Sequence, residues 1–303
     1  MQGGASIVPT LPRIRLKRIL CATDFSPGSF TVLPVAASIA RRYGAKVFVS
    51  NVWAPLPYTM VTPEAVNIME KRQEQVARQK LMEYQQAASA FGISPRLIMK
   101  SGDPVVELER VVREQDIDLA VLSTHGRVGL KHLTMGSVAE ALFRNLSCPV
   151  LTVGPHLAHR FSGNVEVRNI LFPTDMSEDS RAVLAYLASL AKEYDAKLTF
   201  LHVLPEETEQ NPDARSLAEP LRQEMMRIFC PAISPNCQAD FAIEFGDPAA
   251  TVLRCAKDMN ADLIGFGVRP VNDVVLHLRN TVAYRVILDA HCPVLTQRPR
   301  RPW

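Results

Sequence analysis

The sequence predicts an α/β protein made of two tandem doubly wound parallel sheets, each with five strands flanked by helices. Gly102-Asp103-Pro104 recurs as Gly246-Asp247-Pro248, and Cys148-Pro149-Val150-Leu151-Thr152 recurs as Cys292-Pro293-Val294-Leu295-Thr296, both displaced by 144 residues. Within each copy, short apolar runs alternate with longer segments of helical period. Strands that alternate with helices in this way form parallel sheets covered on both faces.

The elements of the first copy follow from these periods. Strands are expected over Arg18 to Ala22, Lys46 to Val52, Arg96 to Lys100, Asp118 to Ser123 and Val150 to Val153. Helices are expected over Ser29 to Tyr43, over Pro63 to Phe91, from Asp103-Pro104 onward and over Gly136 to Arg144. Gly44 is typical of a helix C-cap, while Asp103 followed by Pro104 is typical of a helix start.

The repeat also predicts the domain organisation. Residues 1–16 form an N-terminal tail, 17–154 the first domain, 155–167 a linker, 168–298 the second domain and 299–303 a C-terminal tail. Residues 155–167 show no clear period, as expected of a linker. The short last strands of the two copies are apolar edges that need cover. We therefore expect the two domains to pair within one chain, and a homodimer of chains is left open.

Composition narrows the function classes. The chain has 303 residues, of which 47% are hydrophobic and 21% charged, as in globular proteins. No apolar run reaches the roughly 18 residues of a membrane span, and the first residues do not resemble a secretory signal, so we expect no membrane partner and a cytoplasmic location. The net charge is +3 with scattered cations, which predicts no nucleic-acid partner. The six cysteines lack C-x-x-C spacing, which favours buried free thiols over disulfides or a structural metal.

Chemistry-bearing residues follow the first and fourth predicted strands, where open parallel sheets bind ligands. Thr23 and Asp24 follow the first strand, and Ser123-Thr124-His125-Gly126-Arg127 follow the fourth. Nine residues separate Gly126 from Gly136-Ser137, which opens a helix whose free N–H groups favour an anion. Asp24 could accept hydrogen bonds from a ribose or hold a metal ion.

Each of these residues also has a purely structural interpretation. Ser137 can be a simple N-cap, and Asp24 with Ser26 can cap the first helix. His125 can be a hydrogen-bonded loop residue. The two Gly-Asp-Pro segments are interpreted mainly as helix starts.

These segments closely resemble the universal stress protein family. The resemblance rests on Ile19 to Ser26, Leu122 to Leu130, Gly136 to Glu140 and Cys148 to Leu151. It is strong over about residues 15–153 and weaker over 167–297, as in a tandem member with two domains. Nucleotide-binding members carry Gly-x-x-Gly, nine residues and then Gly-Ser/Thr. This chain has Ser123 in place of the first glycine.

The resemblance implies a site for ATP or another adenine nucleotide, with or without Mg²⁺. Thr23 and Asp24 would lie beside the adenosine, and Val52 would meet the adenine through its backbone. The phosphates would lie on Gly126, Gly136, Ser137 and Val138. The full predicted site is Ala22, Thr23, Asp24, Val52, Ser123, His125, Gly126, Arg127, Gly136, Ser137 and Val138.

The second copy has a degenerate form of this site. It keeps Thr174, Asp175, Val203 and Gly267. Pro270 replaces the central glycine of the pattern, and proline has no N–H to offer a phosphate. We expect weak binding or none there.

Three functions are compatible with these residues. The first is a stress-response protein that binds a nucleotide in its first domain, with the second domain as a structural partner in a pseudo-dimer. The second is an interaction module that binds no nucleotide. The weakest is an enzyme of the related adenine-hydrolase type. No P-loop, Gly-x-Ser-x-Gly or His-Glu-x-x-His motif is present, so we expect no enzyme, and at most a slow hydrolysis of ATP.

Overall fold

The computed structural model describes residues 14–54, 62–124, 135–154, 157, 166–206, 212–268 and 281–299. The chain divides into two compact units, one over Arg15–Val165 and the other over Met1–Ile14 with Glu166–Trp303. Each unit is described by itself below. A search of the described helices finds none with the length and apolarity needed to cross a bilayer.

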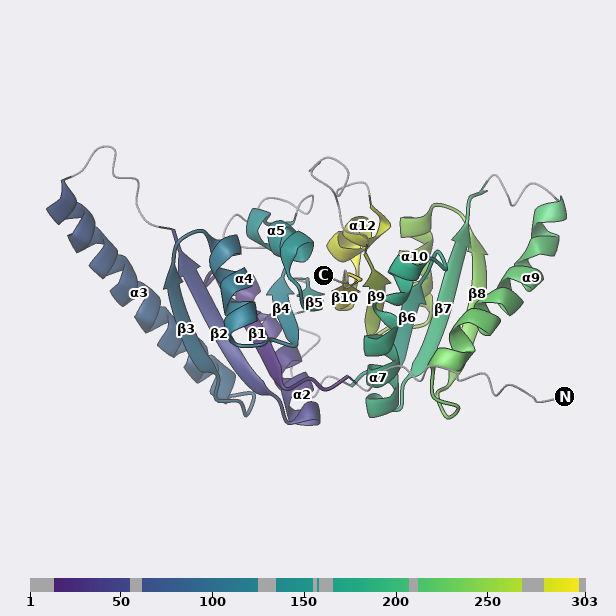
Figure 1. Ribbon diagram of the computed structural model, residues 1–303, viewed down its shortest axis with the longest axis horizontal. Coiled ribbons are helices and arrows are strands. Elements are labelled where there is room, and N and C mark those ends of the chain that lie inside the picture. The colour runs from purple at the N-terminus through teal and green to yellow at the C-terminus, as the bar shows by residue number, and fades with distance from the viewer. Residues whose placement is uncertain are drawn as a thin grey trace, which may run out of the picture. The chain divides into compact units, whose positions relative to one another are not determined.

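The described part of the first unit contains five parallel strands in the order β3-β2-β1-β4-β5 (Figure 1). Their bounds are β1 Arg18–Ala22, β2 Lys46–Trp53, β3 Arg96–Ser101, β4 Leu119–Ser123 and β5 Val150–Val153. Because β1 pairs with β2 on one side and with β4 on the other, the winding direction reverses between β1 and β4. Ligands of such sheets bind beyond the carboxyl ends of the strands at this reversal.

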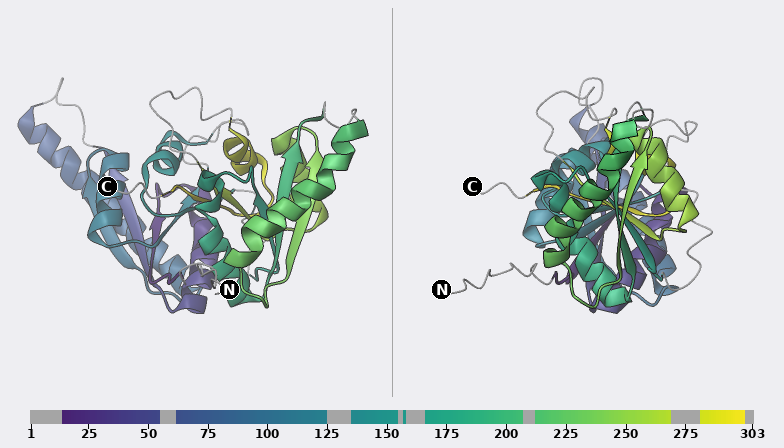
Figure 2. Two further views of the ribbon diagram at one scale, coloured as in Figure 1. Left: turned by 45° about the vertical axis from the view of Figure 1, so that its right-hand side comes forward. Right: turned by 90° about the vertical axis from the view of Figure 1, so that its right-hand side faces the viewer.

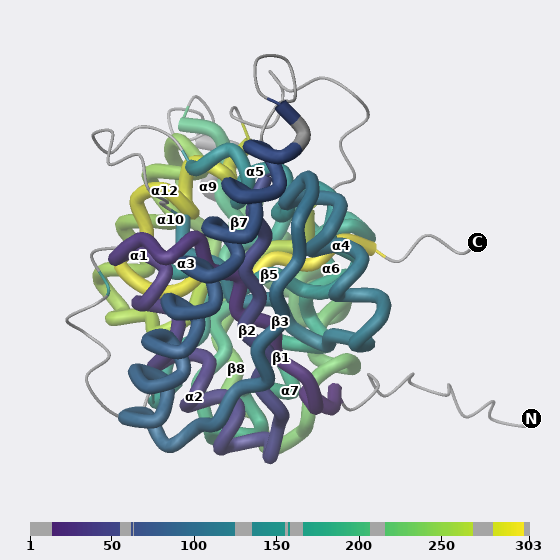
Figure 3. Tube along the Cα trace, turned by 90° about the vertical axis from the view of Figure 1, so that its left-hand side faces the viewer, coloured from purple at the N-terminus to yellow at the C-terminus, as the bar shows by residue number. Residues whose placement is uncertain are grey.

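Helices cover both faces of this sheet. They are α1 Pro27–Phe30, α2 Val32–Tyr43, α3 Pro63–Ser89, α4 Pro104–Glu114 and α5 Ser137–Asn145. Figure 3 looks at the unit from its β3 edge, with α1, α2 and α3 on one side of the sheet and α4 on the other. Successive side chains of β1 point to opposite faces of the sheet. Leu20 joins the core under α4 and α5, while Ile19 and Cys21 are buried on the other face.

The first predicted helix, Ser29 to Tyr43, is wrong in its boundaries, because the structure divides this segment into α1 and α2 at Thr31. Pro34 is the third residue of α2, where its missing N–H costs no intrahelical hydrogen bond. The predicted C-cap is confirmed: Gly44 adopts the left-handed conformation with φ 63°. The long helix ends at Ser89, two residues before the predicted Phe91.

Repeated acidic residues tie the elements together. The Asp118 carboxylate accepts hydrogen bonds from the backbone N–H groups of Lys17 and Arg18 at 2.8 and 2.9 Å, which fixes the start of β1 beside β4. Asp103 caps α4 by accepting from Val105 N and Val106 N, which confirms the helix start predicted from Gly-Asp-Pro. The motif has a structural role in this unit.

The second unit repeats the arrangement. Its described strands are β6 Asn169–Pro173, β7 Lys197–Leu204, β8 Ala239–Phe245, β9 Leu263–Gly267 and β10 Val294–Gln297, all parallel in the order β8-β7-β6-β9-β10. Its helices are α6 Glu178–Arg181, α7 Leu184–Tyr194, α9 Pro212–Phe229, α10 Pro248–Asp258 and α12 Val282–Asp289, with a 3-10 turn over Cys230–Ala232. Helices lie on both sides of this sheet, as the right-hand view of Figure 2 shows.

The cores of the units differ in filling. Phe172, Phe200, Phe229 and Phe241 form an aromatic cluster in the second unit, with centroid distances from 4.7 to 5.7 Å. The first unit places aliphatic side chains on both sheet faces and pairs Phe30 with Tyr84 at 4.6 Å. The predicted architecture of two five-stranded parallel sheets flanked by helices is confirmed. The predicted pairing of the domains stays a prediction.

Candidate functional site

Most of the predicted site residues that the structure describes lie together at the carboxyl ends of the strands in the first sheet. Ala22 and Ser123 end β1 and β4, and Thr23 and Asp24 follow β1 directly. The N–H of Gly136 donates to Thr124 O at 3.0 Å, which holds the start of α5 at the end of β4. Two strand ends and one helix start therefore meet at the reversal of the sheet.

Thr23 organises the turn after β1. Its Oγ1 accepts from Phe25 N at 3.0 Å and lies 2.8 Å from Ser29 Oγ. Because Ser29 Oγ donates to Ser26 O at 2.8 Å, the shared proton between Thr23 and Ser29 comes from Thr23. Phe25 adopts φ 63°, a conformation that costs energy for a non-glycine residue. This network is buried and fixes the path of the chain beside the site.

Tyr84 supports the same turn from α3. Its hydroxyl donates to Ser29 O at 2.6 Å, and the side chain is fully buried. Burial raises the pKa of Tyr84 well above 10.0, so the phenol keeps the proton that it donates. The turn is thus anchored on the face of the sheet that α3 covers.

The structural interpretation of Asp24 with Ser26 is confirmed for Ser26, which is the N-cap of α1, whereas Asp24 supports that cap. Its Oδ1 accepts from Ser26 N at 2.9 Å, and Ser26 in turn caps α1 by accepting from Ser29 N. Asp24 is half-buried and lines a cavity described below. The hydrogen bond to Ser26 N does not exhaust the acceptor capacity of the Asp24 carboxylate, since each oxygen can accept more than one hydrogen bond.

The start of α5 differs from the structural interpretation of Ser137. The N-cap is Gly136, with φ −57° and ψ 141°, and Ser137 is the first helical residue. The interpretation of Ser137 as the N-cap is therefore wrong. Gly136 has no side chain with which to cap the helix, and the N–H groups of a helix's first turn favour an anion. Ser137 and Val138 are exposed beside them.

Three predicted residues, His125, Gly126 and Arg127, lie outside the described residues. Ser123 lies within β4, whose extended backbone does not require glycine. Its side chain stands where the nucleotide-binding pattern has a glycine.

Val52, the remaining predicted residue of the first copy, lines a cavity. It lies near the end of β2 and, with Asp24, lines a cavity of about 720 Å³ that extends under α3. Sequence reasoning missed Trp53 and Gln73, which line the same cavity. Trp53 directly follows Val52 and could have been found from that position, whereas Gln73 could not, because its place on α3 depends on packing.

The second unit repeats the hydrogen-bonded turn that follows the first strand, but a helix covers the end of its strand β9. Thr174 Oγ1 lies 2.8 Å from Ser180 Oγ, and Ser177 N donates to Asp175 Oδ1 at 3.0 Å, as in the first unit. A Cβ on Gly267 would lie 2.2 Å from Asp179 O, so α6 lies directly against the end of β9. Val203, the counterpart of Val52, is half-buried near the end of β7.

The second unit also uses a different helix start. Thr281 is the N-cap of α12, and its hydroxyl accepts from Tyr284 N at 3.3 Å. This side chain takes the place that a ligand oxygen could occupy at α5. Asp247 caps α10 and forms a two-pronged ion pair with Arg285 at 2.9 Å, which lowers the pKa of Asp247.

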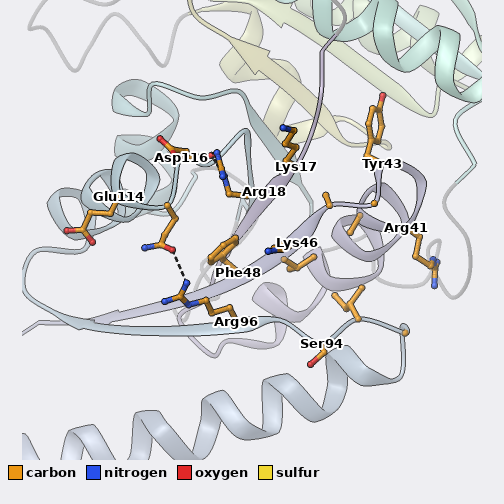
Figure 4. A pocket seen from close by; sticks show the side chains of 17 residues that line it. Lys17, Arg18, Arg41, Tyr43, Lys46, Phe48, Ser94, Arg96, Glu114 and Asp116 are labelled. Atoms are coloured by element: carbon orange, nitrogen blue, oxygen red, sulfur yellow. Dashed lines mark hydrogen bonds and ion pairs between the residues drawn. The ribbon is translucent and has the colours of Figure 1, made fainter.

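A separate basic hollow of about 1180 Å³ lies at the amino ends of the first unit's strands (Figure 4). Arg18 pairs there with Asp116 at 3.4 Å, and Arg96 donates to Gln115. The hollow contains none of the predicted site residues. It also lies at the opposite strand ends from the sheet reversal, where helix carboxyl ends disfavour anions.

The described residues hold no group of three or more His, Cys, Asp or Glu side chains placed to bind a metal ion. The cysteines described are all free thiols: Cys21, Cys148 and Cys292 are buried, and Cys230, Cys237 and Cys255 are at least partly exposed. The prediction of free thiols is confirmed, and the prediction that they are buried holds for half of them.

The fold and the strand-end geometry define a tandem pair of open, doubly wound α/β domains. The family model described as the Universal stress protein family matches residues 15–154 and 166–298. The chain therefore belongs to the universal stress protein family, which confirms the resemblance found in the sequence.

Individual relatives agree with this assignment. Universal stress protein MJ0531 of Methanocaldococcus jannaschii is 28% identical over 138 residues, which is 45% of this chain and 81% of that protein. Universal stress protein A homolog 1 of Coxiella burnetii is 33% identical over 140 residues, or 45% of this chain and 95% of that protein. The crystal structure of a universal stress protein from Archaeoglobus fulgidus matches 94% of this chain and 99% of its own, with 23% identity and a TM-score of 0.69, and so shares the tandem fold.

Proposed function

We propose that the first unit binds ATP or another adenine nucleotide at the reversal between β1 and β4, and that the second unit has lost this site and has a structural role. The start of α5 carries the proposal. Gly136 is the N-cap and has no side chain that could cap the helix, and its hydrogen bond to Thr124 O holds that helix start at the end of β4. A phosphate group there would accept hydrogen bonds from the N–H groups of the first helical turn, and the helix dipole would stabilise its negative charge.

The contrast between the units supports the same proposal. In the second unit the Thr281 hydroxyl caps α12, and the backbone of α6 covers Gly267. A solved universal stress protein is in complex with cAMP, which is a property of that protein. For this chain the proposal depends on its own residues, and it includes binding without a catalytic step.

The test compares two helix starts in one chain. Gly136→Asp places a carboxylate where the phosphate would lie, at a position whose backbone suits an Asp N-cap. We expect ATP binding to weaken at least tenfold, while the free energy of unfolding without ligand changes by only a few tenths of a kcal/mol. Thr281→Asp in α12 is the matched control and should leave ATP binding unchanged. Isothermal titration and ligand-dependent melting measure both.

The outcome that removes the proposal is a wild-type chain whose melting temperature does not rise with millimolar ATP or AMP, because any ligand that binds only the folded state must stabilise it. An interaction module without a nucleotide would then be the better function. The observation that favours this second candidate is Ser123, whose side chain stands in β4 where the binding pattern has glycine.

A further inference from the structure

Each unit has an edge strand that pairs on one side only within the described residues. β3 ends the first sheet beside β2, and β8 ends the second sheet beside β7. In the view of Figure 3, β3 lies between α3 and α4. The open side of an edge strand is a row of backbone N–H and C=O groups on which another extended strand can be added.

Backbone hydrogen bonds show which residues of these strands direct their polar groups outward. Gly102 N donates to Trp53 O at 2.9 Å, and backbone direction alternates along a strand, so the even-numbered residues of β3 point toward β2. Gly246 N donates to Leu204 O at 2.9 Å, so the even-numbered residues of β8 likewise point toward β7. On both edges the odd-numbered residues therefore present their N–H and C=O groups to a further strand.

The two edges carry opposite charges at equivalent positions. Arg96 and Lys100 of β3 correspond, at the offset of 144 residues, to Asp240 and Glu244 of β8. All four side chains are at least partly exposed. Within their own units they contact Gln115, Glu114, Lys197 and Arg254, respectively, at 3.0 to 3.5 Å. These are surface contacts, and ammonium, guanidinium and carboxylate groups can share them with a further partner.

Antiparallel pairing of β3 with β8 satisfies both the backbone and the charges. Directly opposite residues of an antiparallel pair share one face of the sheet, and their side chains interact. When Lys100 lies opposite Asp240, Arg96 lies opposite Glu244. In this same register every outward residue of β3 lies opposite an outward residue of β8, since both sets are odd-numbered. The two strands can then exchange both backbone hydrogen bonds at each such pair.

Parallel pairing does not satisfy both conditions. In a parallel pair a residue that points toward the partner strand lies opposite one that points away, as Trp53 and Ser101 do in β2 and β3. With Arg96 opposite Asp240, outward residues would instead lie opposite outward residues. The charges therefore select the antiparallel arrangement.

The same charges disfavour the pairing of like edges. Two β3 strands in the antiparallel register would place Arg96 opposite Lys100, and two β8 strands would place Asp240 opposite Glu244. Like charges directly opposite each other destabilise a strand pair, and charged edges are a common protection against unwanted pairing. Each edge thus fits the other edge and repels its own kind.

We infer that β3 and β8 form an interface between copies of this chain, in which the β8 edge of one copy adds antiparallel to the β3 edge of another. Lys100 then lies opposite the partner copy's Asp240. Each chain carries both edges, so the interface is heterologous and association continues from copy to copy until it closes. Because the strands are short, the association is weak and depends on concentration. It requires no nucleotide.

Sedimentation velocity of the full chain at low salt tests the inference. We expect reversible association as the protein concentration rises toward about 1 mM, and weaker association in about 0.5 M salt. Lys100→Glu and Asp240→Lys should each weaken association at least fivefold. Lys192→Glu is the matched control and should leave it unchanged, because Lys192 is exposed on α7, which packs against β6, β7 and β9.

Mixing the two edge variants separates the interface from an effect on folding. The reversed charge of Lys100→Glu is complementary to that of Asp240→Lys, and the unchanged Lys100 and Asp240 of the two chains are complementary too. An equimolar mixture should therefore associate at least fivefold more tightly than either variant alone. The double variant, which exchanges the two charges within one chain, should regain the association of the wild type. Urea unfolding of each variant shows that its fold is intact.

Three outcomes overturn the inference. The first is a wild-type chain that stays monomeric over the whole concentration range at low salt. The second is association that neither charge reversal weakens, which would place the interface elsewhere. The third is a mixture of the two variants that associates no better than each alone, because charges that do not face each other cannot be restored by exchange.

Discussion

A Cβ on Gly267 would lie 2.2 Å from the carbonyl oxygen of Asp179 and 2.5 Å from Ser180 O. Such distances are below any van der Waals contact, and the atoms involved are backbone atoms that cannot rotate away. The end of β9 therefore lies directly under α6. At the equivalent position of the first unit β4 ends in Ser123, so the strand end there accommodates a side chain that the end of β9 excludes.

Gly267→Ser should consequently destabilise the second unit. We expect the free energy of unfolding to fall by about 2–3 kcal/mol, because the helix and strand must separate to admit a side chain. Ser123→Gly in the first unit is the reciprocal change and should cost less than about 1 kcal/mol, the backbone entropy of a glycine in a strand. Urea unfolding measures both. Equal effects in the two units would contradict the close approach.

The hydrogen-bond network of Thr23 should contribute measurably to stability. Thr23→Val keeps the shape of the side chain but removes the acceptor of Phe25 N and the donor to Ser29 Oγ, which keeps its own hydrogen bond to Ser26 O. We expect a loss of about 1–3 kcal/mol in the free energy of unfolding. Thr31→Val is the control, since the Thr31 hydroxyl makes a local bond to Gly28 O, and it should cost less than about 1 kcal/mol. Similar losses for the two variants would argue against a cooperative network.

The buried thiols predict a pH dependence at alkaline pH. Burial raises the pKa of Cys21 and of Cys148 to about 12 from an ordinary 9.0. Above about pH 9 the unfolded thiols lose protons that the folded ones keep, so the free energy of unfolding should fall as the pH rises from about 9 toward 12. Below pH 9 these thiols should have no effect.

Urea unfolding at pH 7.5 and 9.5 measures this fall, and the Cys21→Ala and Cys148→Ala variants should show a smaller one than the wild type. In the folded chain iodoacetamide should modify the exposed Cys230 before either buried thiol. A wild type and variants with the same pH dependence would show that the thiols do not ionise differently on unfolding.

The amino end of the second sheet carries an ion pair at two positions that both hold cations in the first sheet. Lys197 Nζ lies 3.0 Å from Asp240 Oδ2, and this lysine lowers the pKa of Asp240. Asp240 pairs in register with Thr199, two residues after Lys197, just as Arg96 pairs with Phe48, two residues after Lys46. Arg96→Asp should raise the free energy of unfolding by roughly 0.2–1 kcal/mol at low salt, and the gain should shrink in 1 M salt. Asp240→Arg should do the reverse. A gain that is independent of salt would indicate another cause.

Much of the fold was predictable because it is written in local patterns. The Gly-Asp-Pro motifs place Asp103 and Asp247 at helix starts, and both cap their helices in the structure. Gly44 ends α2 in the left-handed conformation, as its position indicates. These outcomes depend on a few neighbouring residues, so sequence reasoning reaches them.

The site was only partly predictable. Thr23, Asp24 and Gly136 could be placed at one sheet edge, because the ends of parallel strands meet there. The position of Ser137 after a glycine did not show that Gly136, and not Ser137, is the N-cap of α5. That choice depends on the hydrogen bond from Gly136 N to Thr124 O. Gln73 was out of reach, because a helix of 27 residues presents several glutamines and only packing buries one of them.

The duplication, the parallel α/β class and the membership in the universal stress protein family are all evident from the sequence, because repeats, periods and strand-end motifs are local or self-similar features. The three-dimensional structure was needed to show which strand end excludes a side chain, which residue is the N-cap of α5 and which amide oxygen of α3 is buried. Each of these depends on the distance between segments far apart in the chain, and that distance is set by packing.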